Sequence, residues 1–122
     1  MEQLMASRAD FPPPRPQSSR PEPTRDPDRL LDGLCDALLA PSDRESMRRL
    51  LVDLCTPAET RTLAERWHVA RLLDATPLSY RDIHDATGVS TTTIVRIARF
   101  LRGEANQGYR LALDAIGGRD AG

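Results

Sequence analysis

Gly88 stands between two short segments that carry the start and stop signals of helices. A glycine supplies the left-handed residue of a sharp turn, and the serines at positions 79 and 90 can each cap the helix that follows. Gly103 stops the second segment. The sequence therefore predicts a helix of about two turns over residues 80–87, a tight turn, and a second helix from the cap at Ser90 through Arg102.

Four apolar residues support this pattern, because two helices that cross at a steep angle would bury them against each other. They are Ile83, Val89, Ile94 and Ile97. Together with the glycine and the two caps, their spacing is typical of a helix-turn-helix. An ordinary helical hairpin is the alternative, and the polar face of the second helix argues against it.

This polar face is cationic and rich in hydroxyl groups. A serine and three threonines crowd the first turn, three arginines follow at three-residue spacing, and no acidic residue occurs from Val89 to Gly103. Free amides and hydroxyls at a helix N-terminus suit phosphate oxygens, whereas threonines and arginine forks can reach base edges. A solvated helix face would normally mix charge signs. We therefore expect DNA contacts from Arg81, Ser90, Thr91, Thr92, Thr93, Arg96, Arg99 and Arg102.

The overall charge excludes a uniformly basic coat but leaves room for a local basic face. All 17 basic residues are arginines and 18 residues are acidic, so the 122-residue chain has a net charge of -1. Residues 29–116 hold 12 arginines and 12 carboxylates. The cationic second helix is thus a local exception, and the neutral remainder limits binding that does not depend on base sequence.

No metal site, cofactor or membrane span is expected. Cys35 and Cys55 are too few for a zinc quartet or a disulfide framework, and we interpret them as small buried side chains. His68 is expected to pack beside Trp67, and His84 to lie on the surface. Neither histidine has further ligands at metal-binding spacing, so neither is expected to form a metal site. No apolar stretch approaches ~18 residues and no secretory signal is present. We expect a cytoplasmic protein that associates with the nucleoid when bound to DNA.

Prolines mark where the folded part of the chain begins. Seven of the ten prolines fall within the first 27 residues, where few apolar side chains offset the entropy of ordering the backbone. We expect residues 1–28 to form a disordered tail rich in proline and arginine. Residues 29–116 would then form one helical DNA-binding domain, and residues 117–122 a short flexible C-terminal tail.

Three more helices are predicted before the helix-turn-helix. Leucines at three- and four-residue spacing indicate the first over residues 29–39. Ser42, with a glutamate three residues later, has the form of a capping box and starts a second helix that runs through Leu54. A threonine-proline pair repeats the start signal for a third helix over residues 57–74. This third helix carries apolar residues on more than one face, which a partner subunit could bury.

Four parts of the chain, taken together, match a known family. They comprise residues 54–59, residues 64–73, the helix-turn-helix stretches 79–83 and 87–94, and the closing segment 106–113. On these residues the chain resembles the Trp repressor superfamily, and more closely its Trp-repressor-like branch often labelled YerC/YecD. The resemblance implies an all-α fold of six helices, an intertwined homodimer built from helices one to three and six, and DNA binding through helices four and five.

The resemblance also implies a candidate effector pocket. In the Trp repressor, tryptophan lies between the third helix and the recognition helix, where two arginines hold it. Arg66 and Arg96 match these arginines, and Thr56 matches a contact near the start of the third helix. However, Ile97 and Phe100 stand where the repressor has a glycine and a serine beside the ligand. Because the added side-chain volume would close the pocket, we predict that tryptophan is not the effector; a small-molecule effector stays unknown.

These observations predict a sequence-specific regulator of transcription, a repressor, that binds a two-fold-related operator in double-stranded DNA as a homodimer. Arg81 and the first-turn amides of the second helix would hold phosphates, while Thr92, Thr93, Arg96 and Arg99 would contact base edges.

A second hypothesis is a protein-interaction adaptor, in which the helical dimer and its proline-rich arm bind a partner without reading DNA. A salt-dependent shift of DNA by the purified protein separates the two hypotheses. An enzyme is not expected, because the sequence shows no Ser/His/Asp, Cys/His or paired-carboxylate arrangement.

Overall fold

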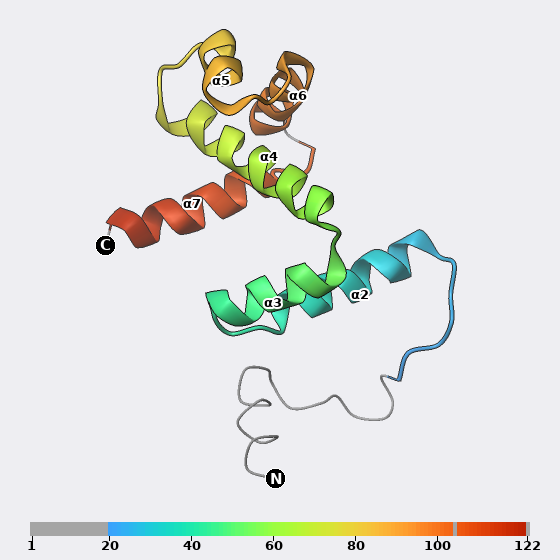
Figure 1. The fold of residues 1–122 in the computed structure, drawn as a ribbon. Coiled ribbons are helices and arrows are strands. Elements are labelled where there is room, and N and C mark those ends of the chain that lie inside the picture. The colour runs from blue at the N-terminus through green and yellow to red at the C-terminus, as the bar shows by residue number, and fades with distance from the viewer. Residues whose placement is uncertain (1–19, 104, 122) are drawn as a thin grey trace. The chain divides into compact units, whose positions relative to one another are not determined.

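The computed structural model describes residues 20–103 and 105–121, which contain six α-helices and no strand (Figure 1). The six-helix, all-α fold predicted from the sequence is therefore confirmed. The chain divides after Thr56 into two units, which are described separately. The helices are α2 (Pro27–Leu39), α3 (Arg44–Leu54), α4 (Pro57–Ala75), α5 (Tyr80–Thr87), α6 (Thr91–Arg102) and α7 (Gly108–Ala121).

Helix α2 begins two residues earlier than expected. Asp26 caps the helix by accepting a hydrogen bond from the backbone N–H of Asp28 at 3.1 Å. Pro27 occupies the first turn, where its missing N–H leaves no hydrogen bond unmade. Residues 27 and 28 thus belong to the helix. Proline disrupts the interior of a helix but is favoured in its first turn. Most of the predicted tail, residues 1–19, lies outside the described residues.

Helix α3 uses a different cap from the one predicted. Asp43, and not Ser42, is the N-cap residue, and its Oδ1 accepts a hydrogen bond from the backbone N–H of Ser46 at 2.8 Å. The predicted cap was wrong by one residue because aspartate and serine cap helices about equally well and stand side by side here. The hydrogen bond from Ser46 lowers the pKa of the Asp43 carboxyl below its usual value of 3.8.

Protonation of Asp43 is expected to weaken α3. Since the folded-state pKa lies below the unfolded value, the charged cap contributes its full stability above about pH 4 and loses it as the pH falls through the folded-state pKa. Asp43→Asn retains a side chain that caps but cannot titrate, so it should lose less melting temperature on acidification. Thermal unfolding of both proteins at neutral pH and at about pH 3 measures the difference. An equal loss in the two proteins would contradict this role.

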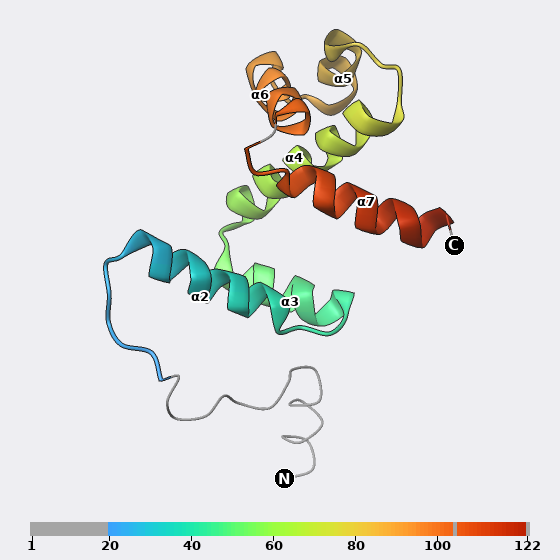
Figure 2. The same ribbon diagram turned by 180° about the vertical axis from the view of Figure 1, so that it is seen from behind.

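The hydrophobic core of the described residues lies in the α4–α7 unit. Helices α4, α5 and α6 pack against one another, and α7 packs on α4 and α6. In both views α7 crosses α4 (Figure 1, Figure 2). All four apolar residues assigned to the helix-turn-helix from the sequence are buried in this core. Its members are Val69, Ala70, Ile83, Val89, Ile94 and Ile97.

An ion pair between Arg110 and Asp74 joins α7 to α4. The guanidinium of Arg110 donates to the carboxylate of Asp74, near the C-terminal end of α4, at 2.7 Å. A second nitrogen of Arg110 donates to Asp114, four residues further along α7, at 3.2 Å. Both hydrogen bonds raise the pKa of Arg110, and the one to Asp74 has the larger effect. This ion pair fixes the first turn of α7 against α4, at one side of the core.

Helix α7 is longer than expected. It continues to Ala121, so residues 117–121 are helical where the sequence analysis placed the start of a flexible tail. The prediction took Gly117 as a helix end. A glycine inside a helix is less favourable than alanine by only ~1 kcal/mol, which does not end a helix by itself.

The α2–α3 unit buries very little of its own surface. Helix α2 contains no buried residue, and α3 contains one, Ser46. Leu30 and Leu31 are each 57% exposed and Leu39 is 81% exposed. Cys35, predicted to be buried, is exposed for the same reason, and Cys55 is only partly buried. A helix with an apolar face needs an apolar surface to cover it, and Leu30, Leu31 and Leu39 stay exposed among the described residues.

Candidate nucleic-acid interface

The turn between α5 and α6 has the geometry that the sequence predicts. Gly88 adopts a left-handed conformation with φ 75°, and its N–H donates to the carbonyl of His84 at 2.8 Å. Ser79 caps α5 in a reciprocal capping box, and Ser90 caps α6 by accepting from the backbone N–H of Thr93. Any residue with a Cβ atom would be strained in the left-handed conformation that Gly88 adopts. The helix-turn-helix is therefore present, with both helix starts fixed by serine caps.

The side chain of His84, for which only a surface position is predicted, forms a hydrogen bond within this turn. Its Nδ1 lies 2.7 Å from the carbonyl oxygen of Val89. Because a carbonyl oxygen only accepts, Nδ1 carries the ring proton and donates it. The N–H of Val89 donates to Thr87 Oγ1, which in turn donates to the carbonyl of Ile83. Both polar backbone groups of Val89, the residue before the Ser90 cap, are thus held by side chains.

Replacing His84 with alanine is expected to lower the free energy of unfolding by about 1 kcal/mol, the net value of one hydrogen bond. His84→Asn places an amide N–H close to the position of Nδ1 and should recover most of this loss. Urea unfolding followed by circular dichroism, at one fixed protein concentration, provides the measurement. If the asparagine variant is as unstable as the alanine variant, the ring packs in the turn and its hydrogen bond contributes nothing.

The exposed face of α6 gathers four of the predicted DNA-contact residues around one shallow hollow. This hollow is lined by Thr91, Thr92, Val95, Arg96, Arg99 and Phe100. Arg81, in the first turn of α5, and Arg102, in the last turn of α6, are also exposed. Val95 was missed by the sequence analysis. Its signal was the helical spacing, since Val95 lies four residues after Thr91 and four before Arg99 and so shares their face.

Ser90 and Thr93 serve the helix start rather than this face. The hydroxyl of Ser90 accepts from the N–H of Thr93 at 3.2 Å and donates to Thr93 Oγ1 at 3.0 Å. Thr93 is only partly exposed and does not line the hollow. The structure therefore separates Thr93 from Thr91 and Thr92, with which the sequence analysis had grouped it.

The electrostatics of α6 favour an anionic partner. The helix has no acidic residue in its first turn and carries Arg99 and Arg102 in its last. The first-turn amides of an α-helix have no intrahelical acceptor and give its N-terminus a partial positive charge. Phosphate oxygens can use such amides, and the arginine forks extend the positive surface along the helix.

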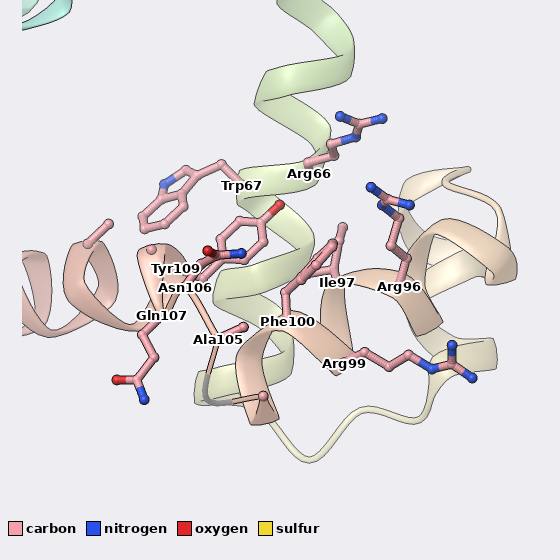
Figure 3. Close-up of a pocket in the computed structure, with 13 residues that line it drawn as sticks. Arg66, Trp67, Arg96, Ile97, Arg99, Phe100, Ala105, Asn106, Gln107 and Tyr109 are labelled. Carbon is pink, nitrogen blue, oxygen red and sulfur yellow. The ribbon is translucent and has the colours of Figure 1, made fainter. Parts of the chain in front are cut away.

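A second hollow, of about 480 Å³, lies between α4, α6 and the start of α7 (Figure 3). It contains both predicted effector-pocket arginines, and Figure 3 shows Arg66 from α4 and Arg96 from α6 extending toward the same side. The rings of Trp67 and Tyr109, which also line it, stack with centroids 6.5 Å apart and 18° between their planes. Thr56, the third predicted pocket residue, is not among the described residues that line it.

Ile97 and Phe100, which are predicted to close this pocket, both line it but differ in exposure. Ile97 is turned into the core and is 1% exposed, because it belongs to the buried stripe of α6. Phe100 is 42% exposed and lies under the guanidinium of Arg96, whose central carbon is 5.0 Å from the ring centroid. Phe100 therefore occupies the arginine end of the hollow, which Trp67 and Tyr109 also line.

Across residues 20–103 and 105–121, no group of three or more His, Cys, Asp or Glu side chains could hold a metal ion. No helix in this part of the chain has both the length and the apolar character needed to cross a bilayer.

The six helices, the glycine turn and the two serine caps define an all-α helix-turn-helix protein. The chain belongs to the Trp repressor family, since the family model described as Trp repressor protein matches residues 29–116. Membership in this family indicates a helix-turn-helix regulator that binds DNA, and the fold is that of a regulator rather than an enzyme.

Relatives and solved structures agree with this assignment. The chain is 41% identical over 86 residues to the uncharacterized protein YerC of Bacillus subtilis (strain 168), a match that covers 70% of this chain and 81% of YerC. A TrpR-like protein from Eubacterium eligens ATCC 27750 superimposes with a TM-score of 0.66 at 32% identity, over 73% of this chain and 90% of that one. A candidate Trp repressor from Staphylococcus aureus gives a TM-score of 0.66 at 35% identity, over 73% and 87%.

Proposed function

We propose that the protein is a sequence-specific transcriptional repressor that binds a two-fold-related operator as a homodimer. The observation that carries this proposal is the exposed hydroxyl-and-arginine face of α6, which follows directly on the glycine turn and the Ser90 cap. In helix-turn-helix proteins, the Trp repressor among them, the second helix of the motif enters the major groove with its N-terminal residues against the bases. Helix α6 has the residues for this placement.

The contacts divide by chemistry. Arg81 and the amides at Ser90 and Thr91 would hold phosphates, which position the protein without reading sequence. Thr92, Arg96 and Arg99 would contact base edges, where threonine and the arginine fork have matching groups. Thr93 would act through the cap that orients the helix, and Arg102 would reach the phosphate backbone.

Exposed apolar residues support the homodimer. Within the chain alone, Leu30 and Leu31 of α2 are each 57% exposed, Val52 of α3 is 71% and Leu63 of α4 is 50%. Stable helical proteins bury such residues, and a second copy offers the matching surface. The two α6 helices would then contact half-sites one helical turn apart, about 34–36 Å.

The domain boundaries follow from this function. Residues 29–116, together with Pro27 and Asp28 at the start of α2, would form the DNA-binding domain. The protein would act in the cytoplasm, at the nucleoid when bound to DNA.

Tryptophan is not the effector in this proposal. Phe100 lies under Arg96 at the arginine end of the hollow, where the resemblance places the ligand. A ligand there would have to displace an aromatic ring, which overpacks the site. Calorimetry should detect no tryptophan binding at micromolar concentrations, and binding that also tightens the affinity for DNA would refute this part of the proposal.

Selection from a random DNA library by the full-length protein tests the function directly. The expected result is a sequence with dyad symmetry, bound by two chains, with an affinity that falls steeply as salt is added. Analytical ultracentrifugation of the free protein and of the complex gives the number of chains. Selection of no sequence, together with no salt-dependent binding of any DNA, would contradict the proposal and favour the adaptor.

A further inference from the structure

Val95 is an apolar side chain in the middle of the polar face of α6. It is 37% exposed, although it directly follows Ile94, which is fully buried. It lines the same hollow as Thr91, Thr92 and Arg99. The valine thus stands one helical turn from the threonines on one side and one turn from an arginine on the other.

A single exposed apolar residue is common on protein surfaces and needs no explanation by itself. The setting of Val95 is different because its neighbours on this face are the residues proposed to read DNA. A β-branched residue is also a poorer helix former than alanine, and Val95 is not part of the core cluster. Neither helix propensity nor core packing accounts for a valine here.

The chemistry of the side chain restricts what it can recognise. Valine has no hydrogen-bonding group, so it cannot read the donors and acceptors at a base edge. The 5-methyl group of thymine is the apolar feature that the major groove presents, and apolar side chains contact it. Thr91 and Thr92 line the same hollow one helical turn before Val95, and each carries a methyl group.

We propose that Val95 is a specificity-determining residue that packs against the 5-methyl group of one thymine in each half-site. This inference rests on the proposed function, because it requires α6 to lie in the major groove. It adds one base contact to the proposed function: Val95 would contact a thymine next to the base pairs that Thr92 and Arg99 would contact.

Deoxyuridine substitution tests the proposal, since uracil differs from thymine only by the absent methyl group. The site is first selected from a random library by the full-length protein, and each thymine is then replaced in turn. Wild-type protein should lose about fourfold in affinity per half-site at one thymine, the factor expected from the burial of one methyl-sized group. Fluorescence anisotropy at a fixed salt concentration measures the dissociation constants.

Val95→Ala assigns the effect to the side chain. This variant should bind the thymine site about as weakly as the wild type binds the uracil site, and it should no longer distinguish the two. Thr92→Ser removes a methyl group from the same face and is the matched control, which should keep the sensitivity to uracil at this position. Circular dichroism confirms that both variants are folded.

Two results would overturn the inference while leaving the proposed function in place. Either the wild type tolerates uracil at every thymine of the site, or Val95→Ala keeps the full sensitivity and another side chain reads the methyl group. If the wild type selects no site at all, the proposed function fails first and the inference falls with it.

Discussion

Replacing Ile94 with alanine is expected to lower the free energy of unfolding by about 2–5 kcal/mol. Ile94 is fully buried and contributes to the one core that the described residues form. Its removal leaves a cavity among Val69, Ile83 and their neighbours, and a folded domain is stable by only ~5–15 kcal/mol. The midpoint of urea unfolding should therefore shift strongly, with measurements made at equal protein concentration because assembly also adds stability.

The adjacent residue provides the matched control. Val95→Ala removes an apolar side chain of similar size from the same helix, but from its exposed face. We expect its free energy of unfolding to stay within ~0.5 kcal/mol of the wild type, since surface changes of this kind have small effects. Similar losses in the two variants would show that the face of α6 has been assigned incorrectly.

Replacing Arg99 with alanine is expected to weaken binding to the selected operator by about 1–3 kcal/mol, roughly 5- to 150-fold. Arg99 extends away from the Trp67 and Tyr109 rings in Figure 3 and lines the exposed hollow of α6. If its fork reads a base, the variant should also tolerate other base pairs at one position of each half-site. Competition between operator variants measures both effects.

Arg81→Ala is the comparison for a phosphate contact. This variant should weaken binding to all sequences about equally and reduce the slope of log affinity against log salt by about 1. The proposed roles of Arg99 and Arg81 are thus distinguished by the change in sequence specificity, and not by the loss of affinity. Equal losses on operator and on unrelated DNA for Arg99→Ala would place Arg99 on the phosphate backbone and contradict its proposed role.

The helix-turn-helix could be predicted from the sequence because several local signals agree there. The left-handed conformation at residue 88 and the serine caps depend on residues close in the chain, and helical spacing marks Ile83 and Ile94 as core residues. Such signals act through short-range hydrogen bonds and helical spacing, which a sequence displays directly.

Helix ends were harder to predict because the competing states differ little in energy. Asp43 and Ser42 are nearly equivalent caps, so the sequence alone did not choose between them. Pro27 can end a tail or start a helix, and Gly117 only weakens α7. In each case the alternatives lie within ~1 kcal/mol, and contacts elsewhere in the fold can decide the outcome.

The candidate site could be predicted only in part from the sequence, for a different reason. The hydrogen bond from His84 to Val89 and the placement of Phe100 under Arg96 depend on side-chain rotamers, which a sequence does not display. Hydrogen-bonding groups alone place Thr93 with the other threonines and give no role to Val95. Helical spacing alone places Val95 on the same face as Thr91 and Arg99.

The bare apolar surface of α2 affects how the protein would respond to its own abundance. In the proposed homodimer, the α2 leucines that are exposed among the described residues of one chain would be packed only when two chains meet. At low concentration the number of paired chains then varies with the square of the total, so a twofold fall in synthesis removes about three quarters of the pairs. Occupancy of a DNA site would follow the pairs, and transcription would change more steeply than the amount of protein.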